Sequence, residues 1–235
     1  MSTILVNLRP VAYDRNLYVS NPTEKRQIVV RHTGLRTGPN DRLAYLLETE
    51  KKLPASVIVA QNGEPLQCFA STYWGRHLGV KARTLAEHGF HDAGVRGDLL
   101  NQGSIAVELH SAGGLMFYRG QWYMTKVDPT CGELEPNLKR PMHREAVVKY
   151  AGGYGGFEGY ERYTKAQIDT LRQLLHYWSY EHSIPARGRA DAWFGSREAL
   201  AGAGGVFTML SYQPDSTLVH PQDELRELLA NPQRW

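Results

Sequence analysis

The sequence predicts a single α/β domain, and three stretches of the chain support this fold class. Residues 28–35 read IVVRHTGL, and three consecutive β-branched residues are typical of a strand buried on both faces. Asn62 and Gly63 separate two strand-like runs and suit the tight turn of a hairpin. Thr164 and Gln167 form a capping box ahead of apolar residues at helical spacing, which predicts an amphipathic helix.

Composition limits the classes of protein to consider. The 235 residues are enough to bury a core, and a net charge of +3 from 27 basic and 24 acidic residues argues against a nucleic-acid polymer as partner. Cys68 and Cys131 form no disulfide framework and have no metal-motif spacing. The chain shows no signal peptide and no apolar run of membrane-spanning length, so we expect a soluble cytoplasmic protein without a membrane partner.

The first half of the chain is expected to alternate strands with one helix. Ile4 to Leu8 is a candidate edge strand, and Ile28 to Arg31 is the predicted central strand. Asp41 is a plausible N-cap for a helix that continues to about Glu50. Residues 56–61 and 65–70 are then the two strands of the first hairpin.

A second set of elements follows the aromatic and basic loop YWGRHLG, residues 73–79, which is of the kind that lines a groove. Residues 104–110 alternate apolar and other side chains, as a strand does, with Glu108 in the middle of the strand. Such a carboxylate either lies on a solvated face or serves as a general base beneath a site. Leu115 to Tyr118 and Trp122 to Lys126 form a predicted second hairpin.

The last third of the chain contains an excursion and two helices. Residues 128–160 are rich in Gly, Pro and Tyr, and we expect an irregular surface excursion there and not a second core. The helix that begins at Thr164 is predicted to run to about His182 and to pack on the sheet. Pro221 opens a short closing helix, at the first turn where its missing amide is harmless.

The end of the central strand is the candidate site. In open α/β sheets the ligand crevice lies beyond the carboxyl ends of the strands, which places Arg31, His32 and Thr33 beside it. The alternative is that these residues only begin a turn at Gly34.

Several blocks, taken in order, resemble one family. They are IVVRHT, NGEPLQ, YWGRHLG, SIAVELHSAGGL, the hairpin with QWY, YTKAQIDTLRQLL and GGVFTMLSYQPDSTLVHPQDELRELL. Together they are similar to zinc-dependent N-acetylmuramoyl-L-alanine amidases of the phage and bacterial type, which share a fold with peptidoglycan recognition proteins. The resemblance covers roughly Gln27 to the C-terminus. It implies a mixed central sheet flanked by helices, with a groove for peptidoglycan, and hence one amidase-like domain over residues 1–235.

The resemblance also implies a zinc site that this sequence lacks. Family members hold zinc with a His, His, Asp set and use a Glu, often with a Lys, to assist a zinc-activated water. The corresponding ligand positions here are Arg31, Met209 and Leu218, and the Lys position is Ser216. A guanidinium, a thioether and an isobutyl group do not bind zinc, so we expect no metal cofactor. Glu108 is retained as the former general base.

Arg31 has two interpretations. As a structural replacement for zinc, its cation would neutralise a buried Glu108 in a bidentate pair. As a functional residue, it would hold the anionic part of a ligand, a stem-peptide carboxylate or a phosphate. The other residues expected to bind ligand are His32, Trp74, His77, Met209, Asp215 and His220.

Two classes of function therefore compete. The first is a pseudo-amidase, an inactive binding protein that recognises a muropeptide or a nucleotide-like small molecule in the former catalytic groove. The alternative is an active, endolysin-like amidase whose zinc site is rebuilt from His32, His77, His110 or His220, or a zinc-free hydrolase that uses Glu108. The sequence names neither the ligand nor the oligomeric state.

Overall fold

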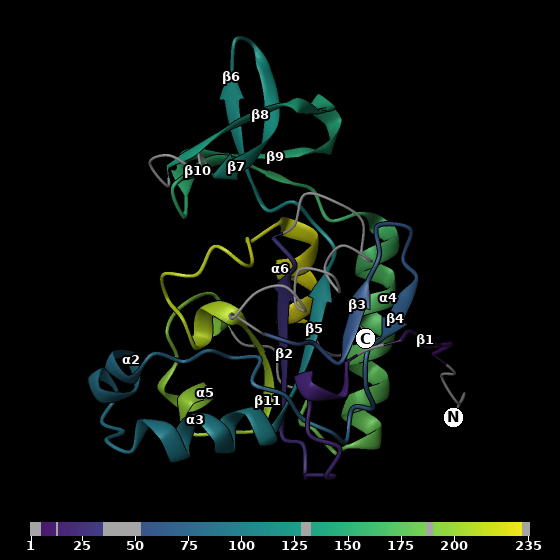
Figure 1. Ribbon diagram of the computed structural model, residues 1–235, viewed down its shortest axis with the longest axis vertical. Coiled ribbons are helices and arrows are strands. Elements are labelled where there is room, and N and C mark those ends of the chain that lie inside the picture. Colours follow the sequence, from purple (N-terminus) through teal and green to yellow (C-terminus); the bar gives the residue numbers. More distant parts are fainter. Residues whose placement is uncertain (1–5, 13, 35–52, 128–132, 187–189, 232–235) are drawn as a thin grey trace.

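Two β-sheets and a set of flanking helices make up the computed structural model, which describes residues 6–12, 14–34, 53–127, 133–186 and 190–231 (Figure 1). The first sheet has six strands, in the spatial order β1 (Arg9–Pro10), β4 (Pro65–Gln67), β3 (Val57–Val59), β5 (Ser104–Leu109), β2 (Gln27–His32) and β11 (Gly205–Thr208). The second has five, in the order β8 (Leu134–Met142), β7 (Gln121–Val127), β6 (Gly114–Tyr118), β10 (Phe157–Glu161) and β9 (Val147–Tyr154). The α-helices are α2 (Ala82–Glu87), α3 (Ala93–Gln102), α4 (Lys165–Glu181), α5 (Arg197–Leu200) and α6 (Asp223–Ala230), and the 3-10 turns are η1 (Arg15–Leu17), η2 (Arg144–Ala146), η3 (Ala190–Trp193) and η4 (Met209–Ser211).

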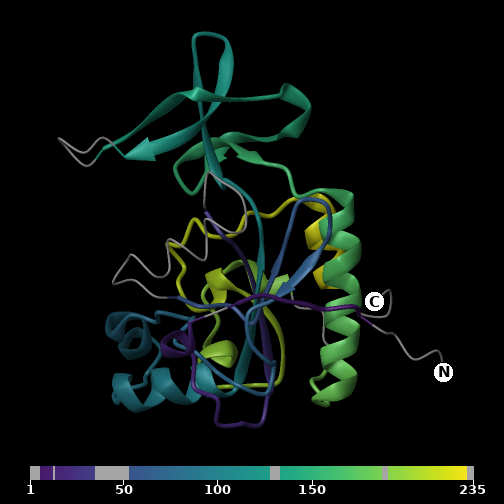
Figure 2. The ribbon, with the colours of Figure 1, turned by 45° about the vertical axis from the view of Figure 1, so that its right-hand side comes forward.

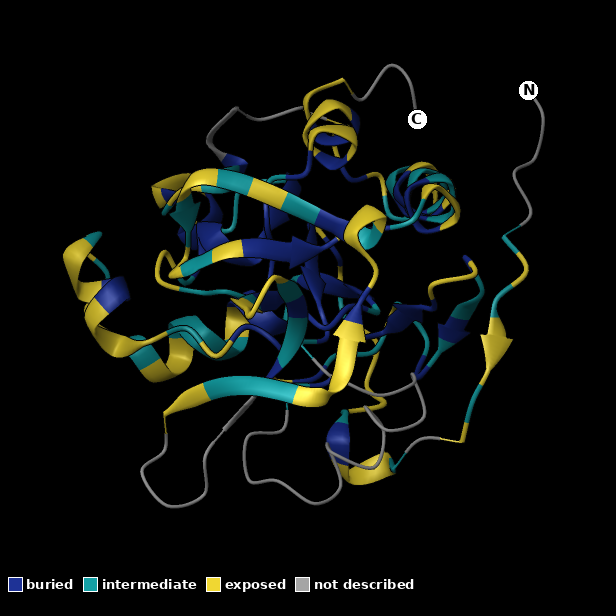
Figure 3. Ribbon diagram, turned by 90° about the horizontal axis from the view of Figure 1, so that it is seen from above, coloured by how far each residue is buried: buried dark blue, intermediate teal, exposed yellow. Residues whose placement is uncertain are grey.

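The six-stranded sheet is mixed and lies between two layers of helices, as predicted. Strand β2 runs parallel to β5 and β11, whereas β3 and β4 pair antiparallel. One face carries the apolar cluster under α4 and α6, and the other face carries a cluster under α2, α3 and α5 (Figure 1). Ile28, Val29 and Val30 are fully buried between these layers, so the central strand is confirmed. From above, the four buried strands β2, β3, β5 and β11 are drawn dark blue near the centre of the molecule (Figure 3).

Several local predictions are also confirmed. Thr164 caps α4, and both hydrogen bonds of the capping box with Gln167 are present. The first hairpin turns at Gly63, whose φ of +87° favours glycine and whose ideal Cβ would lie 2.9 Å from the carbonyl oxygen of Ala166. Pro221 precedes α6, although it stands just before the N-cap residue and not in the first turn.

The N-terminal edge strand is displaced from its predicted position. No strand covers residues 6–8, because the Leu8 amide donates to the Val6 carbonyl in a local turn. Pairing begins only at β1, where the Val11 amide reaches the Gln67 carbonyl beside β4. The helix predicted from Asp41 to Glu50 lies outside the described residues.

The prediction that residues 128–160 form an irregular excursion is wrong for the residues that the structure describes. Strands β8, β9 and β10 join the second hairpin in a five-stranded sheet that stands away from the main body (Figures 1 and 2). Pro136 and Pro141 lie in β8, an edge strand, where a missing amide is tolerated. The glycines of β9 lie on the opposite edge. A segment rich in glycine and proline can therefore form strands when these residues lie at the edges of a sheet.

The five-stranded sheet has a small apolar cluster of its own around Trp122. Gly159 makes room for this ring, since a Cβ there would lie 2.6 Å from a Trp122 ring carbon. Phe117 packs on Trp122 with ring centroids 5.0 Å apart, and the Lys149 ammonium lies 5.8 Å from the Trp122 ring centroid. Within the described part of the chain, no helix is long and apolar enough to cross a bilayer.

Candidate functional site

Arg31 and Glu108 form a buried ion pair at the carboxyl end of the central strands. They are directly opposite in the parallel pairing of β2 with β5, and Arg31 Nη2 lies 2.8 Å from Glu108 Oε1. Each side chain is 1% exposed. Arg31 also donates to the backbone carbonyls of His77, Leu53 and Pro54. The structure thus contains the ion pair that the structural interpretation of Arg31 expects, with Arg31 Nη2 in contact with Glu108 Oε1.

This environment does not fit the other interpretation of Arg31, as an anchor for a ligand anion. The guanidinium faces the interior, and a carboxylate and three carbonyls already surround it. A ligand anion would have to displace Glu108, which would leave a second buried charge uncompensated. Glu108 is fully buried too, so a hydrolytic water cannot reach it in this arrangement.

His32 points to the opposite face of β2 and meets His220 there. The ring centroids of the two imidazoles are 6.0 Å apart. His32 Nδ1 is hydrogen-bonded to the Tyr163 hydroxyl at 2.8 Å, and His220 Nδ1 to the Tyr150 hydroxyl at 2.7 Å. His220 Nε2 lies 3.1 Å from the Glu161 carbonyl, which only accepts, so this nitrogen carries the proton and Tyr150 donates to Nδ1.

Burial keeps this pair of histidines neutral. It lowers the pKa of His32 to about 4 and that of His220 well below its ordinary value. The rings of Tyr160 and Tyr163 stack on His220 with centroids 4.7 and 4.3 Å away. Burial likewise raises the pKa of the Tyr163 hydroxyl. The space around the two imidazoles is therefore filled by aromatic rings with neutral hydrogen bonds.

The remaining predicted ligand-binding residues are dispersed. His77 is a core residue and not a groove residue, since it is 2% exposed, bonds to Gly75 and Ser104, and has its pKa lowered to about 3 by burial. Met209 lies fully buried in the cluster under α4 and α6. Trp74 is half-buried, and its backbone forms a bridge with Val19.

Asp215 is exposed and pairs with Lys81 at 2.5 Å, which lowers the pKa of the carboxyl. Leu218, at the third former ligand position, does lie beside the central strand, because its carbonyl accepts from the His32 amide at 2.6 Å. The structure thus brings Arg31, Glu108 and His77 together on one side of the sheet and His32 and His220 together on the other.

These residues do not fit a zinc ion. Among the described residues, no group of three or more His, Cys, Asp and Glu side chains is placed to hold a metal. Where the resemblance puts the first ligand, Arg31 places a cation beside Glu108, and a dication there would be repelled. The nitrogens of His32 and His220 that bond to tyrosines would have to give up those partners to bind zinc.

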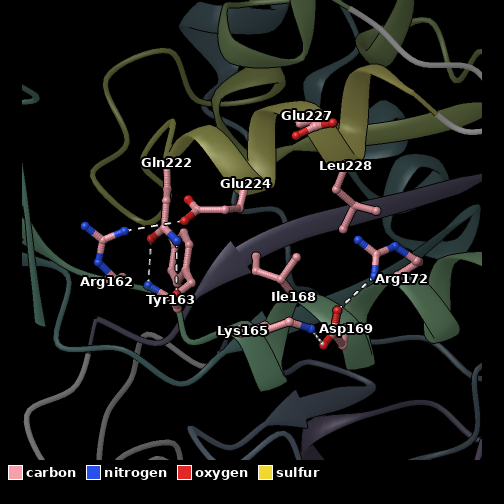
Figure 4. A pocket seen from close by; sticks show the side chains of 10 residues that line it. All are labelled: Arg162, Tyr163, Lys165, Ile168, Asp169, Arg172, Gln222, Glu224, Glu227 and Leu228. Atoms are coloured by element: carbon pink, nitrogen blue, oxygen red, sulfur yellow. Dashed lines mark hydrogen bonds and ion pairs between the residues drawn. The ribbon is translucent and has the colours of Figure 1, made fainter. Parts of the chain in front are cut away.

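Sequence reasoning missed a cavity between α4 and α6, which Tyr163 helps to line. Its volume is about 510 Å³ (Figure 4). Its walls come from segments about sixty residues apart in the sequence, so no local motif marks it. It is lined by Arg162, Tyr163, Lys165, Ile168, Asp169, Arg172, Gln222, Glu224, Glu227 and Leu228.

Comparison with known proteins gives a structural likeness and no sequence match. No family model and no curated protein sequence matches the chain. The structure is similar to that of PlyL, with a TM-score of 0.41 and 14% identity over 88% of this chain and 83% of that chain. A mutant of PlyL gives a TM-score of 0.41 and 13% identity over 88% and 84% of the two chains. A likeness of this degree carries no functional argument.

Proposed function

We propose that this protein is a pseudo-amidase, an amidase-like protein that binds a small anionic ligand and does not hydrolyse it. The observation that carries the proposal is the buried ion pair of Arg31 with Glu108. The two residues occupy the positions that the resemblance assigns to a zinc ligand and to the general base. Their pairing gives each of them a structural partner in place of a metal or a water.

Hydrolysis of an amide would need an activated water molecule and a general base that this water can reach. Glu108 is fully buried and held by a guanidinium. Met209 and Leu218 supply no ligand suited to zinc, and Met209 is sealed in the core. The groups needed for zinc-dependent cleavage are therefore absent from the positions where the resemblance expects them.

The ligand, a muropeptide or a nucleotide-like molecule, needs cationic groups that reach solvent. Arg31 cannot supply them, because its exposed fraction is 1%. The cavity between α4 and α6 offers Arg162 and Arg172, whose side chains are 44% and 39% exposed. We therefore move the expected anion contact from the former catalytic groove to this cavity.

The alternative function, an amidase with a rearranged site, draws on one observation. His32 and His220 lie with ring centroids 6.0 Å apart, which is a separation that two ligands of one metal can have. Binding would require both imidazoles to exchange a tyrosine hydrogen bond for the metal.

Metal analysis and a cleavage assay separate the two functions. Protein purified without chelator is assayed for zinc by elemental analysis and for release of stem peptide from a muropeptide. The pseudo-amidase proposal expects well under one equivalent of zinc and no release above a heat-denatured control. One equivalent of zinc that disappears in His32→Ala and His220→Ala, together with peptide release, would establish the amidase instead. His91→Ala serves as the control, because His91 is exposed between α2 and α3 and belongs to none of the candidate ligand sets.

A further inference from the structure

The cavity between α4 and α6 has a fixed floor and a fixed end wall. Ile168 of α4 and Leu228 of α6 are almost fully buried and form the apolar floor between the helices (Figure 4). At one end the buried Gln222 side chain holds the backbone of Tyr163 at two points. Its Oε1 accepts from the Tyr163 amide at 2.7 Å, and its Nε2 donates to the Tyr163 carbonyl at 3.0 Å. This clamp joins the beginnings of the two helices, so the cavity is preformed.

The charges that line the cavity are divided between its two walls (Figure 4). The wall formed by α4 and the residues before it carries three cations and the single carboxylate of Asp169. Asp169 is shared, because it pairs with both Lys165 and Arg172. On the α6 side, the lining residues that the structure describes include two carboxylates and no cation. These charged lining residues are Arg162, Lys165, Arg172, Asp169, Glu224 and Glu227.

Among these described residues, one wall therefore has two positive charges in excess, the other has two negative charges, and together they are neutral. Arg162 and Glu224 form an ion pair across the walls that is long at 3.5 Å, and both side chains are about half exposed. Such a pair contributes little to stability and rearranges at small cost. Arg162 and Glu224 can thus turn toward a ligand.

We propose that this cavity binds a small zwitterion, an amino acid or a short peptide with free ends. Its carboxylate would face the cations of the α4 wall, and its ammonium group would face Glu224 and Glu227 on α6. A ligand that carries an ammonium group beside its carboxylate can pair with both walls, whereas an anion without an ammonium group can pair with the α4 wall alone. The volume of about 510 Å³ lies in the usual range for small-molecule sites. The proposal rests on the proposed function, because it keeps the anion contact in this cavity and adds an ammonium group to the ligand.

Three matched probes test the assignment, with binding measured by isothermal titration calorimetry. Dialanine carries both charges, N-acetyl-dialanine lacks the ammonium group and dialanine amide lacks the carboxylate. We expect dialanine to bind and each blocked probe to bind at least about tenfold more weakly, because each loses one charge-assisted contact. Arg172→Gln should weaken dialanine by a similar factor. Arg83→Gln, at an exposed arginine of α2 outside the cavity, should leave its affinity unchanged.

Each other result has a separate meaning. The zwitterion proposal would be overturned if the three probes bound with equal affinity. It would also be overturned if Arg172→Gln left the affinity for dialanine unchanged. If a muropeptide binds with an affinity that Arg172→Gln does not alter while dialanine fails to bind, the cavity proposal is wrong but the proposed function stands. Absence of binding by every probe and by the muropeptide would overturn both. Circular dichroism of each variant verifies that it is folded, which is expected for substitutions of exposed side chains.

Discussion

Removing one partner of the Arg31–Glu108 pair should destabilise the protein more than any exposed ion pair does. The charged atoms are 2.8 Å apart and each side chain is 1% exposed. At an effective dielectric constant of about 20, two unit charges at this distance attract by roughly 6 kcal/mol, most of which offsets their desolvation. Arg31→Met leaves the Glu108 carboxylate buried without its cation. We expect a loss of about 3 to 5 kcal/mol in the free energy of unfolding.

A double substitution tests whether the charge itself is the cause. Arg31→Met combined with Glu108→Leu removes both charges, and it should recover most of the stability that either single substitution loses, because apolar replacements of buried ion pairs are often neutral or stabilising. The free energy of unfolding of all three variants is measured by urea denaturation, monitored by circular dichroism. An unchanged m-value shows that each variant exposes the same surface on unfolding, so the free energies can be compared. The pair Arg83 and Glu87 has the same 2.8 Å separation but is largely exposed, so Arg83→Met should cost under about 0.5 kcal/mol.

Two results would refute this reasoning. A loss below about 1 kcal/mol in Arg31→Met would mean that water or another cation reaches Glu108, contrary to its burial. A double variant as unstable as the sum of the singles would mean that Arg31 acts through its three carbonyl contacts and not through its charge.

Three further predictions test other parts of the structure. Burial lowers the pKa of Lys25 to about 7, so the folded state holds fewer protons than the unfolded state between pH 7 and about 10.5. Stability in urea should therefore rise with pH across this window, by at most about 5 kcal/mol, and Lys25→Met should abolish the rise. Thr164→Ala removes the capping box of α4 and should cost about 1 kcal/mol in the same assay, whereas Thr164→Ser should cost little. Gly159→Ala would bring a methyl group onto the Trp122 ring, and it should lower stability by about 1 to 3 kcal/mol and shift the tryptophan fluorescence.

The elements that sequence reasoning located are those whose signals are local. The capping box of Thr164 and Gln167 lies within one turn of helix, and the Asn62–Gly63 turn fixes its own hairpin. The central strand was recognisable because three apolar β-branched residues in a row require burial on both faces. None of these inferences needs information about distant parts of the chain.

The five-stranded sheet was missed because its signals depend on tertiary position. Proline and glycine in a strand are tolerated at a sheet edge, and only the completed topology reveals that β8 and β9 are the two edges. Glycine is typical of turns, but Gly159 lies in strand β10, where its missing side chain leaves room for the Trp122 ring of β7. Composition alone does not distinguish these roles.

The candidate site was predictable in its geometry and not in its accessibility. The two-residue period of a strand places Arg31 and His32 on opposite faces, and the structure has them there. A polar side chain near the end of a strand can line a groove or form hydrogen bonds within the core. Which of the two occurs depends on residues that are distant in the sequence. His77 illustrates this, since Gly75 and Ser104 satisfy it in the interior.

The unpredicted sheet and the closed site are physically connected. Tyr150 of β9 and Tyr160 of β10 belong to the segment that composition marked as irregular, and both contact His220. The same segment thus completes the second sheet and fills the space around the two imidazoles with aromatic rings. Metal binding by His32 and His220 would require Tyr163 and Tyr150 to release their hydrogen bonds. On the proposed function, a separate feature therefore opposes a metal on each face of β2: the buried ion pair on one face, and the tyrosine packing around the imidazoles on the other.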